Sequence, residues 1–188
     1  MKRIKAEISA RHLHISRKHL DKLFGSAYQL KPIKDLSQPG EFASEEKVEV
    51  TGPKGKLSMR IVGPVRPQTQ VELALTDARI LGVKPAIRVS GDLAGSPGGL
   101  TLKGPRGSVK LNEGIIVPQR HLHISLADAK KWHIKNGQKL KALIKGPRSL
   151  ELREIVARVG NYSTAIHLDT DEGNAAGLLT CSIIDLDI

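Results

Sequence analysis

Two identical segments of this chain carry paired histidines. Residues 11–16 read Arg-His-Leu-His-Ile-Ser, and residues 120–125 read the same. Side chains alternate between the two faces of a β-strand, so both histidines of a His-x-His motif share one face, about 6–7 Å apart. Two imidazoles so placed can bind one metal ion, and zinc accepts imidazole nitrogen readily. The repeat therefore predicts two related metal sites.

A second, weaker repeat offers a third ligand for each histidine pair. Residues 69–73 read Thr-Gln-Val-Glu-Leu and residues 164–168 read Thr-Ala-Ile-His-Leu; each precedes a Thr-Asp pair suited to starting a helix. Catalytic zinc sites usually combine three protein ligands with one open position. We therefore predict one three-residue site in each half of the chain, formed by His12, His14 and Glu72 in the first and by His121, His123 and His167 in the second.

The remaining histidines and the single cysteine receive plainer interpretations. A lone His-x-His motif is more often a surface or hydrogen-bonding pair, and it is the exact duplication that favours metal binding. His19 and His133 fall outside the repeated motif, in helical segments, and we expect them to be exposed or partly buried polar residues. Cys181 lies in an apolar stretch with no neighbouring base, so we expect a buried cysteine rather than a nucleophile. One cysteine also excludes an intramolecular disulfide.

The composition limits the classes of partner. The 188 residues carry a formal net charge of +11, and aromatic residues make up 3%. Such a charge fits nucleic acid, an anionic membrane surface or a phosphate-bearing small molecule. The basic residues are scattered, however, and the clustered aromatics of a single-strand binder are missing from the sequence. We therefore expect a phosphate-bearing ligand, with neither nucleic acid nor a membrane as partner.

The elements that must position these residues are short. Gly-Pro turns at residues 52–55, 104–107 and 146–148 separate strand-like runs, which predicts hairpins. Ser16 is expected to cap a helix that ends at Gly25, and Ser125 one that ends at Asn136-Gly137. Many short strands and few helices predict a mainly β fold of two pseudo-symmetric β-barrels with short capping helices.

The repeat also predicts the division of the chain. We expect a first barrel-forming half at residues 1–85, a Gly-rich connecting segment at residues 86–117 and a second barrel-forming half at residues 118–188. These parts would form one compact unit and could share strands. The stretch at residues 90–99 is too rich in glycine for an interior strand, and we expect a long ordered loop that carries function.

Three arginines lie close to the predicted metal sites. Arg11 and Arg120 precede the two histidine pairs, and structural and coenzyme-contacting roles are equally open for them. Arg66 stands six residues before Glu72 in a Pro-flanked stretch. Its guanidinium could bind phosphate bidentately beside a metal, although an ordinary surface arginine is the expectation from this local pattern.

Several longer motifs extend this pattern over nearly the whole chain. They read Ser-Ala-Arg-His-Leu-His-Ile-Ser, Leu-Ser-Gln-Pro-Gly-Glu-Phe, Gly-Pro-Val-Arg-Pro-Gln-Thr-Gln-Val-Glu-Leu, Ser-Gly-Asp-Leu-Ala-Gly-Ser-Pro-Gly, Arg-His-Leu-His-Ile-Ser and His-Leu-Asp-Thr-Asp-Glu-Gly-Asn-Ala-Ala-Gly. In these motifs, in order from about Ser9 to about Gly177, the chain resembles the propanediol-utilisation phosphotransacylase family (phosphate propanoyltransferase, PduL-type). Together the motifs are highly specific.

The resemblance implies an activity and a set of site residues. It implies two β-barrels with a two-zinc site between them, and reversible conversion of acyl-CoA (propanoyl-CoA, acetyl-CoA or both) and inorganic phosphate into acyl phosphate and free coenzyme A. It supports Glu72 as a metal ligand and Arg66 as the phosphate-binding arginine. Asn174 matches a family active-site position and is expected to be catalytic, and Ser9 and Gln70 match further positions near the metals and are expected, with Arg66, to bind substrate.

The N-terminus leads to an expectation about location. Family members packaged in bacterial microcompartments carry an amphipathic N-terminal extension, whereas the first motif begins here at Ser9. The C-terminal stretch at residues 180–188 alternates like a strand and is no anchor. We therefore expect a cytoplasmic enzyme, serving acetate metabolism and assembled as a homodimer, although no residue pattern specifies that assembly.

Direct acyl transfer in a ternary complex is the favoured mechanism, because no convincing covalent nucleophile is visible. Two alternatives come from other classes. A zinc-dependent hydrolase of a phosphate ester would keep the metals and Arg66 but need no coenzyme A. A basic nucleic-acid-binding β-barrel would show salt-dependent affinity and would not need the histidines.

Overall fold

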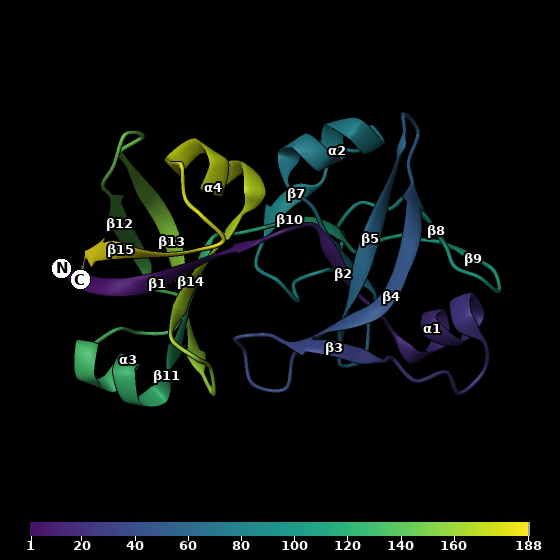
Figure 1. The fold of residues 1–188 in the computed structure, drawn as a ribbon, viewed down its shortest axis with the longest axis horizontal. Coiled ribbons are helices and arrows are strands. Elements are labelled where there is room, and N and C mark those ends of the chain that lie inside the picture. Colours follow the sequence, from purple (N-terminus) through teal and green to yellow (C-terminus); the bar gives the residue numbers. More distant parts are fainter. Residues whose placement is uncertain (188) are drawn as a thin grey trace. The chain divides into compact units, whose positions relative to one another are not determined.

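The computed structural model describes residues 1–187, which form a mainly β protein with short helices (Figure 1). The helices are α1 (Arg17–Phe24), α2 (Leu75–Leu81), α3 (Leu126–Trp132) and α4 (Thr170–Ala176). The strands are β1 (Lys2–Ser9), β2 (His12–His14), β3 (Pro32–Asp35), β4 (Phe42–Thr51), β5 (Lys56–Gly63), β6 (Gln70–Glu72), β7 (Ala86–Arg88), β8 (Thr101–Lys103), β9 (Ser108–Lys110), β10 (Ile115–Pro118), β11 (His121–Ser125), β12 (Lys139–Ile144), β13 (Leu150–Gly160), β14 (Ala165–Asp169) and β15 (Cys181–Asp187).

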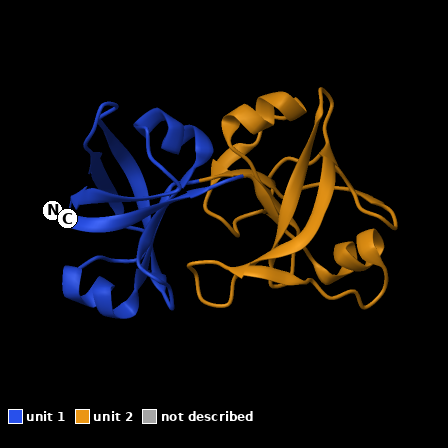
Figure 2. Ribbon diagram, viewed as in Figure 1, with its two compact units in different colours: residues 1–10, 119–188 blue, residues 11–118 orange. Residues whose placement is uncertain are grey.

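The chain divides into two compact units, coloured separately in Figure 2. Unit 1 combines residues 1–10 with the residues from 119 onward, and unit 2 comprises residues 11–118. The first ten residues therefore pack with the C-terminal half, although sequence order grouped them with the first half. Each unit has its own apolar core, around Leu122 and Ile166 in unit 1 and around Leu13 and Val71 in unit 2.

A closed six-stranded barrel forms unit 1, in the order β1-β14-β11-β13-β12-β15. Strand β1 pairs in parallel with β14 and antiparallel with β15, so the two ends of the chain lie side by side (Figure 1). The alternation of the C-terminal stretch is confirmed as strand β15, while Ile188 lies outside the described residues. A closed barrel leaves no free sheet edge, which explains why the N-terminal strand belongs to this unit.

Unit 2 contains a nine-stranded sheet in the order β7-β10-β6-β2-β5-β4-β8-β9, with β3 paired to β4. The Gly-Pro turns at residues 52–55 and 104–107 connect β4 to β5 and β8 to β9, as predicted, and residues 146–148 connect β12 to β13 in unit 1. The mainly β class and one of the two expected barrels are thus confirmed, and a second barrel stays a prediction.

Strand register shows that the two units repeat one arrangement. In unit 2, β2 lies between β5, which is parallel to it, and β6, which is antiparallel. In unit 1, β11 lies between parallel β13 and antiparallel β14 in the same way. His12 stands opposite Glu72, and His121 stands opposite His167. The equivalence of Glu72 and His167, aligned from a weak sequence repeat, is therefore confirmed by backbone pairing.

The helix after each histidine pair begins with the predicted cap. The Ser16 side chain accepts a hydrogen bond from the backbone N–H of His19, and the Ser125 side chain accepts one from Asp128. The predicted end of the second helix at Asn136-Gly137 is wrong. Helix α3 ends at Trp132 because His133 adopts a left-handed backbone conformation, with φ 55°, and its N–H bonds to carbonyls of the last turn.

The arginine of each repeat has the same structural role. Arg11 Nη1 donates to Asp77 Oδ1 at 2.9 Å, and Arg120 Nε donates to Glu172 Oε1 at 2.6 Å. Both carboxylates lie in the first turn of a helix, α2 or α4, where acidic side chains favour the helix dipole. The repeated arginine therefore ties the histidine strand to the helix that follows the third predicted ligand, which confirms a structural contact; a coenzyme-contacting role stays a prediction. In residues 1–187, no helix has the length and apolarity needed to cross a membrane.

Candidate metal centres

The predicted trio of unit 2 comes together at the paired strands β2 and β6. His12, His14 and Glu72 each offer a ligand atom, and these atoms all lie within 4.8 Å of one another. The Nε2 atom of His12 is 3.6 Å from Glu72 Oε2, and the Nε2 atom of His14 is 3.9 Å from Glu72 Oε1. All three side chains face one point because His12 and His14 share a strand face and Glu72 stands opposite His12.

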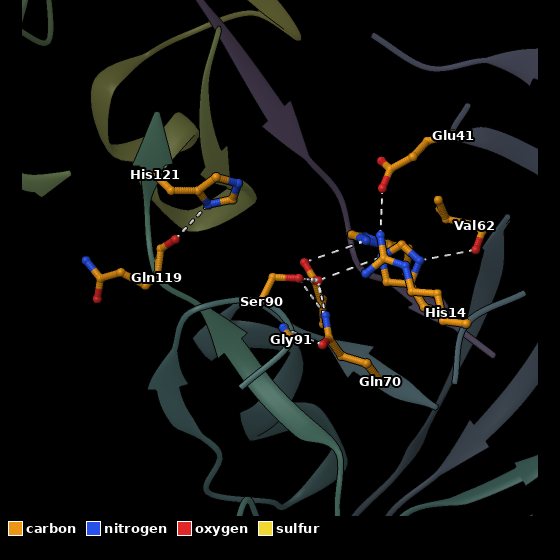
Figure 3. A network of polar contacts seen from close by, with 11 residues as sticks. His14, Glu41, Val62, Gln70, Ser90, Gly91, Gln119 and His121 are labelled. Carbon is orange, nitrogen blue, oxygen red and sulfur yellow. Dashed lines mark hydrogen bonds and ion pairs between the residues drawn. The ribbon is translucent and has the colours of Figure 1, made fainter. Parts of the chain in front are cut away.

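The environment of His14 fixes its ring and keeps it neutral. Its Nδ1 atom lies 3.2 Å from the carbonyl oxygen of Val62 (Figure 3), so the Nδ1–H tautomer donates there. Its Nε2 atom is then available toward Glu72. Burial, followed by the charges of His12 and Arg66, lowers the pKa of His14 to about 3. A neutral imidazole is the form that binds metal, and an oriented Nδ1–H is the usual way a protein presents Nε2.

The trio of unit 1 repeats this arrangement with three histidines. The ligand atoms of His121, His123 and His167 also lie within 4.8 Å of one another. His121 Nδ1 lies 2.9 Å from the carbonyl oxygen of Gln119, which selects the tautomer with Nε2 available (Figure 3). The rings of His121 and His167 stack with centroids 5.2 Å apart. Glu7, opposite His167 on β1, places Oε2 3.7 Å from His167 Nε2.

An aromatic side chain completes the unit 1 site. The ring of Tyr162 stacks on His123 with centroids 4.2 Å apart and an interplanar angle of 15°. Tyr162 follows Gly160, at which a Cβ atom would lie 2.7 Å from the tyrosine ring, so only glycine admits this approach. An aromatic residue shortly before the third ligand is the one local signal that could have pointed to this contact.

Arg66 lies beside the unit 2 site, in the segment between β5 and β6. Its backbone N–H donates to the carbonyl oxygen of Ile15, directly after the histidine pair. Its Nη2 atom donates to Glu41 Oε1 at 2.6 Å, and its positive charge helps to lower the pKa of His14. The Arg66 side chain is 31% exposed, so it is neither buried in the core nor an isolated surface group. Glu41 was not predicted as a site residue.

The other predicted site residues have different surroundings. Asn174 is exposed on α4 of unit 1. Ser9 ends strand β1, partly buried and opposite Asp169. Gln70 is buried at 2% exposure, and its side-chain amide binds Glu72, Ser90 and Gly91. The roles of these residues toward substrate stay predictions.

The plainer expectations have mixed outcomes. His19 is partly buried and its Nδ1 atom lies 2.8 Å from Thr69 Oγ1; burial lowers its pKa. His133 is exposed. The expectation of a buried Cys181 is wrong, because the cysteine is exposed at the start of β15. Successive side chains of a strand face opposite ways, so a residue in an apolar strand can still be exposed on the outer face.

Both trios fit zinc on their donor chemistry. Imidazole nitrogen and carboxylate oxygen are typical zinc ligands, and three protein ligands are typical of a site that keeps a position open. The neutral ring of His14 meets the requirement that a ligand be deprotonated, and backbone carbonyl contacts orient the rings of both His14 and His121.

Comparison with known proteins assigns the family. A family model described as phosphate propanoyltransferase matches residues 5–179. The phosphate propanoyltransferase of Alkaliphilus metalliredigens is 43% identical over 92% of this chain and 82% of its own length. That of Thermotoga maritima is 42% identical over 94% and 85%, and that of Leptotrichia buccalis is 45% identical over 91% and 82%. The chain therefore belongs to the phosphate propanoyltransferase family and is an acyltransferase, as its motifs predicted.

Proposed function

We propose that this chain is a zinc-dependent phosphate acyltransferase that exchanges an acyl group between coenzyme A and inorganic phosphate. The observation that carries the proposal is the duplicated trio, whose six side chains occupy equivalent strand positions in a member of the phosphate propanoyltransferase family. The relatives are named phosphate propanoyltransferases, which favours a propanoyl group as the one transferred, and we expect propanoyl-CoA and acetyl-CoA as its donors.

His12, His14 and Glu72 would hold one zinc ion, and His121, His123 and His167 would hold the other. Bound zinc would supply Lewis-acid stabilisation of negative charge on phosphate, carbonyl oxygen or thiolate. The protein's own contribution is orientation. Hydrogen bonds from His14 to Val62 and from His121 to Gln119 fix both rings before anything binds, which reduces the reorganisation needed during the reaction.

Arg66 would bind the attacking phosphate. A guanidinium can donate two parallel hydrogen bonds to phosphate oxygens, and the backbone contact with Ile15 keeps this arginine next to the histidine pair. Glu41 accepts a hydrogen bond from Nη2 and limits the orientations of the guanidinium. Phosphate would then bind a guanidinium that is already oriented, although it would compete with the Glu41 carboxylate for that guanidinium.

Asn174 would donate a hydrogen bond to the thioester carbonyl oxygen or to the departing thiolate, where charge develops in the transition state. We infer direct transfer, in which a phosphate oxygen forms the new bond to the acyl carbon and the carbon–sulfur bond breaks, so that the electron pair leaves on coenzyme A. Ping-pong kinetics or a burst of acyl-enzyme would contradict this course. The homodimer and the cytoplasmic location remain predictions for sedimentation and fractionation.

The decisive experiment is phosphate-dependent release of free coenzyme A from acetyl-CoA and propanoyl-CoA by metal-analysed protein. His12→Ala and His123→Ala each remove one predicted ligand, and Ser58→Ala, on the exposed side of β5, is the matched control. Two zinc equivalents, with activity lost in both histidine variants and kept in the control, would support the proposal. Bound zinc without release of coenzyme A would instead favour the phosphate-ester hydrolase.

A further inference from the structure

The Glu72 carboxylate is held by the glycine-rich loop that follows β7. Ser90, the first residue of that loop, donates from Oγ to Glu72 Oε1 at 2.8 Å. The Gln70 amide nitrogen donates to the same carboxylate oxygen and, at 2.8 Å, to the Ser90 hydroxyl (Figure 3). Glu72 Oε1 therefore receives two hydrogen bonds, while Oε2 lies 3.6 Å from His12 Nε2.

The Gln70 side chain also anchors the loop backbone. Its Oε1 atom accepts a hydrogen bond from the N–H of Gly91 at 2.8 Å. Gly91 has φ 99°, a conformation that favours glycine, which suits the turn that brings this N–H inward. Both ends of the Gln70 amide thus bind within the network, and at 2% exposure the side chain has no freedom to turn elsewhere.

The contact has a physical consequence for metal binding. A carboxylate that rotates freely loses side-chain entropy when it binds an ion, whereas one held by two donors is already oriented. The loop carrying Ser90 is separated from β6 in sequence but stabilised on it by these bonds, and further along the Ser96 hydroxyl accepts from the N–H of Gly114 at 2.8 Å. Backbone bonds from Ile115 to Pro97 and from Gly99 to Leu111 attach the loop as well, so it is held at its beginning and along its second half.

Unit 1 has a different residue at the corresponding position. Strand pairing places Gln70 opposite His14, and it places Ala165 opposite His123. Alanine has no polar side chain, so the third ligand of unit 1 cannot be held by this residue. The hydrogen-bonded support from the neighbouring position is therefore specific to the site of unit 2.

We propose that Ser90 and Gln70 are positioning residues for Glu72 and that they couple the order of the loop at residues 90–99 to metal binding at the His12–His14–Glu72 site. This inference rests on the proposed metal site. Because coupling between two equilibria is reciprocal, zinc bound by Glu72 should also stabilise the loop. Gln70, expected from the family resemblance to contact substrate, acts here through Glu72.

Zinc affinity tests the positioning role without any measurement of activity. In a His121→Ala background, which leaves one predicted site, Ser90→Ala should weaken zinc binding by roughly tenfold to a hundredfold in competition with a chromogenic chelator. Ser58→Ala is the matched control and should bind as the parent does. Ser90→Thr, which keeps the hydroxyl, should recover most of the affinity. Affinities of Ser90→Ala and parent within twofold of each other would overturn the proposal.

Hydrogen exchange tests the coupling. In the wild-type chain, zinc should slow amide exchange in the peptide that covers residues 90–99, and Gln70→Ala should abolish that difference. Equal exchange with and without zinc in the wild-type chain would contradict the coupling. Gln70→Ala also serves as the second affinity variant should Ser90→Ala fold poorly, and His167→Asn is the second background.

The two proposals fail in different ways. A parent chain that binds no zinc in either background would count against the proposed metal site and with it against the coupling. Tight zinc binding by the parent, with Ser90→Ala and Gln70→Ala unchanged, would leave the proposed function standing and overturn the positioning role alone.

Discussion

The two units use one strand arrangement to support different chemical surroundings. In both, a His-x-His strand lies between a parallel and an antiparallel neighbour, and the third predicted ligand stands opposite the first histidine. The segment that leads to the third ligand differs: it carries Arg66 in unit 2 and Tyr162 in unit 1. The repeated backbone therefore determines where the predicted ligands lie, while a few side chains in the connecting segments give each site its own charge.

Equivalent glycines illustrate the same point. Gly63 ends β5 and Gly160 ends β13, and at each position a Cβ atom would collide with an aromatic ring, that of Phe42 or that of Tyr162. Both units thus use glycine to admit a ring at the same point of the fold. In unit 1 that ring stacks on the predicted ligand His123. In unit 2 the segment that follows the glycine carries the cation of Arg66.

The largest effect should come from removing one histidine of each site. His14→Ala and His121→Ala should each lose one zinc equivalent and reduce kcat/KM by about a thousandfold or more, because a metal ion supplies several kcal/mol of transition-state stabilisation. Metal content by mass spectrometry and initial rates measure this. Full activity in either variant would show that the two sites are not equally required.

The next-largest effect should come from replacing Arg66, which lies beside the site of unit 2. Arg66→Lys keeps the charge but loses the bidentate fork, so the KM for phosphate should rise by roughly tenfold to a hundredfold with a smaller change in the KM for acyl-CoA. The measurement is the rate at varied phosphate with saturating acyl-CoA. An unchanged KM for phosphate would remove Arg66 from the phosphate site. A Tyr162→Phe variant is the comparison from unit 1.

The equivalent arginine–helix pairs allow a test of stability against pH. Burial raises the pKa of Glu172, and the positive charge of Arg120 opposes that shift. Arg120→Met removes the opposing charge and should therefore raise the pKa of Glu172 further. A raised folded-state pKa contributes stability at low pH that is lost as pH rises, so the substitution should destabilise the protein mainly at neutral pH.

We expect a loss of about 1–2 kcal/mol in the free energy of unfolding at pH 7 and little change near pH 4. Urea unfolding of Arg120→Met at both pH values is the measurement. Arg11→Met, which removes the counterpart contact with Asp77, is the matched variant from unit 2. If Arg120→Met lowers the free energy of unfolding equally at both pH values, the cause is lost packing of the long side chain and not the ionisation of Glu172.

The smallest effect should come from Glu41. Glu41→Gln keeps an oxygen that can accept from Arg66 but removes the negative charge that competes with phosphate. The KM for phosphate should fall by roughly twofold to fivefold, the scale of a partly exposed ion pair. Phosphate saturation curves at constant ionic strength measure it. A rise in KM would show that Glu41 matters more for orienting Arg66 than for competing with the substrate.

Features that are local or repeated could be predicted from the amino-acid sequence. Exact duplication identified all four histidines of the two pairs, the weaker repeat identified Glu72 and His167, and the period of strands and turns determined the mainly β class. Serine caps and Gly-Pro turns were predictable because they depend on residues within a few positions of each other.

Contacts between residues far apart in the sequence could not be predicted in this way. The pairing of β1 with β14 and β15, the ion pair of Arg11 with Asp77 and the hold of Ser90 on Glu72 all join segments whose separation no local pattern encodes. The exposure of Cys181 likewise depends on which face of a closed barrel a strand residue occupies. Such contacts form when the apolar core of each unit packs and brings particular strands together, and which strands pair depends on residues from the whole chain.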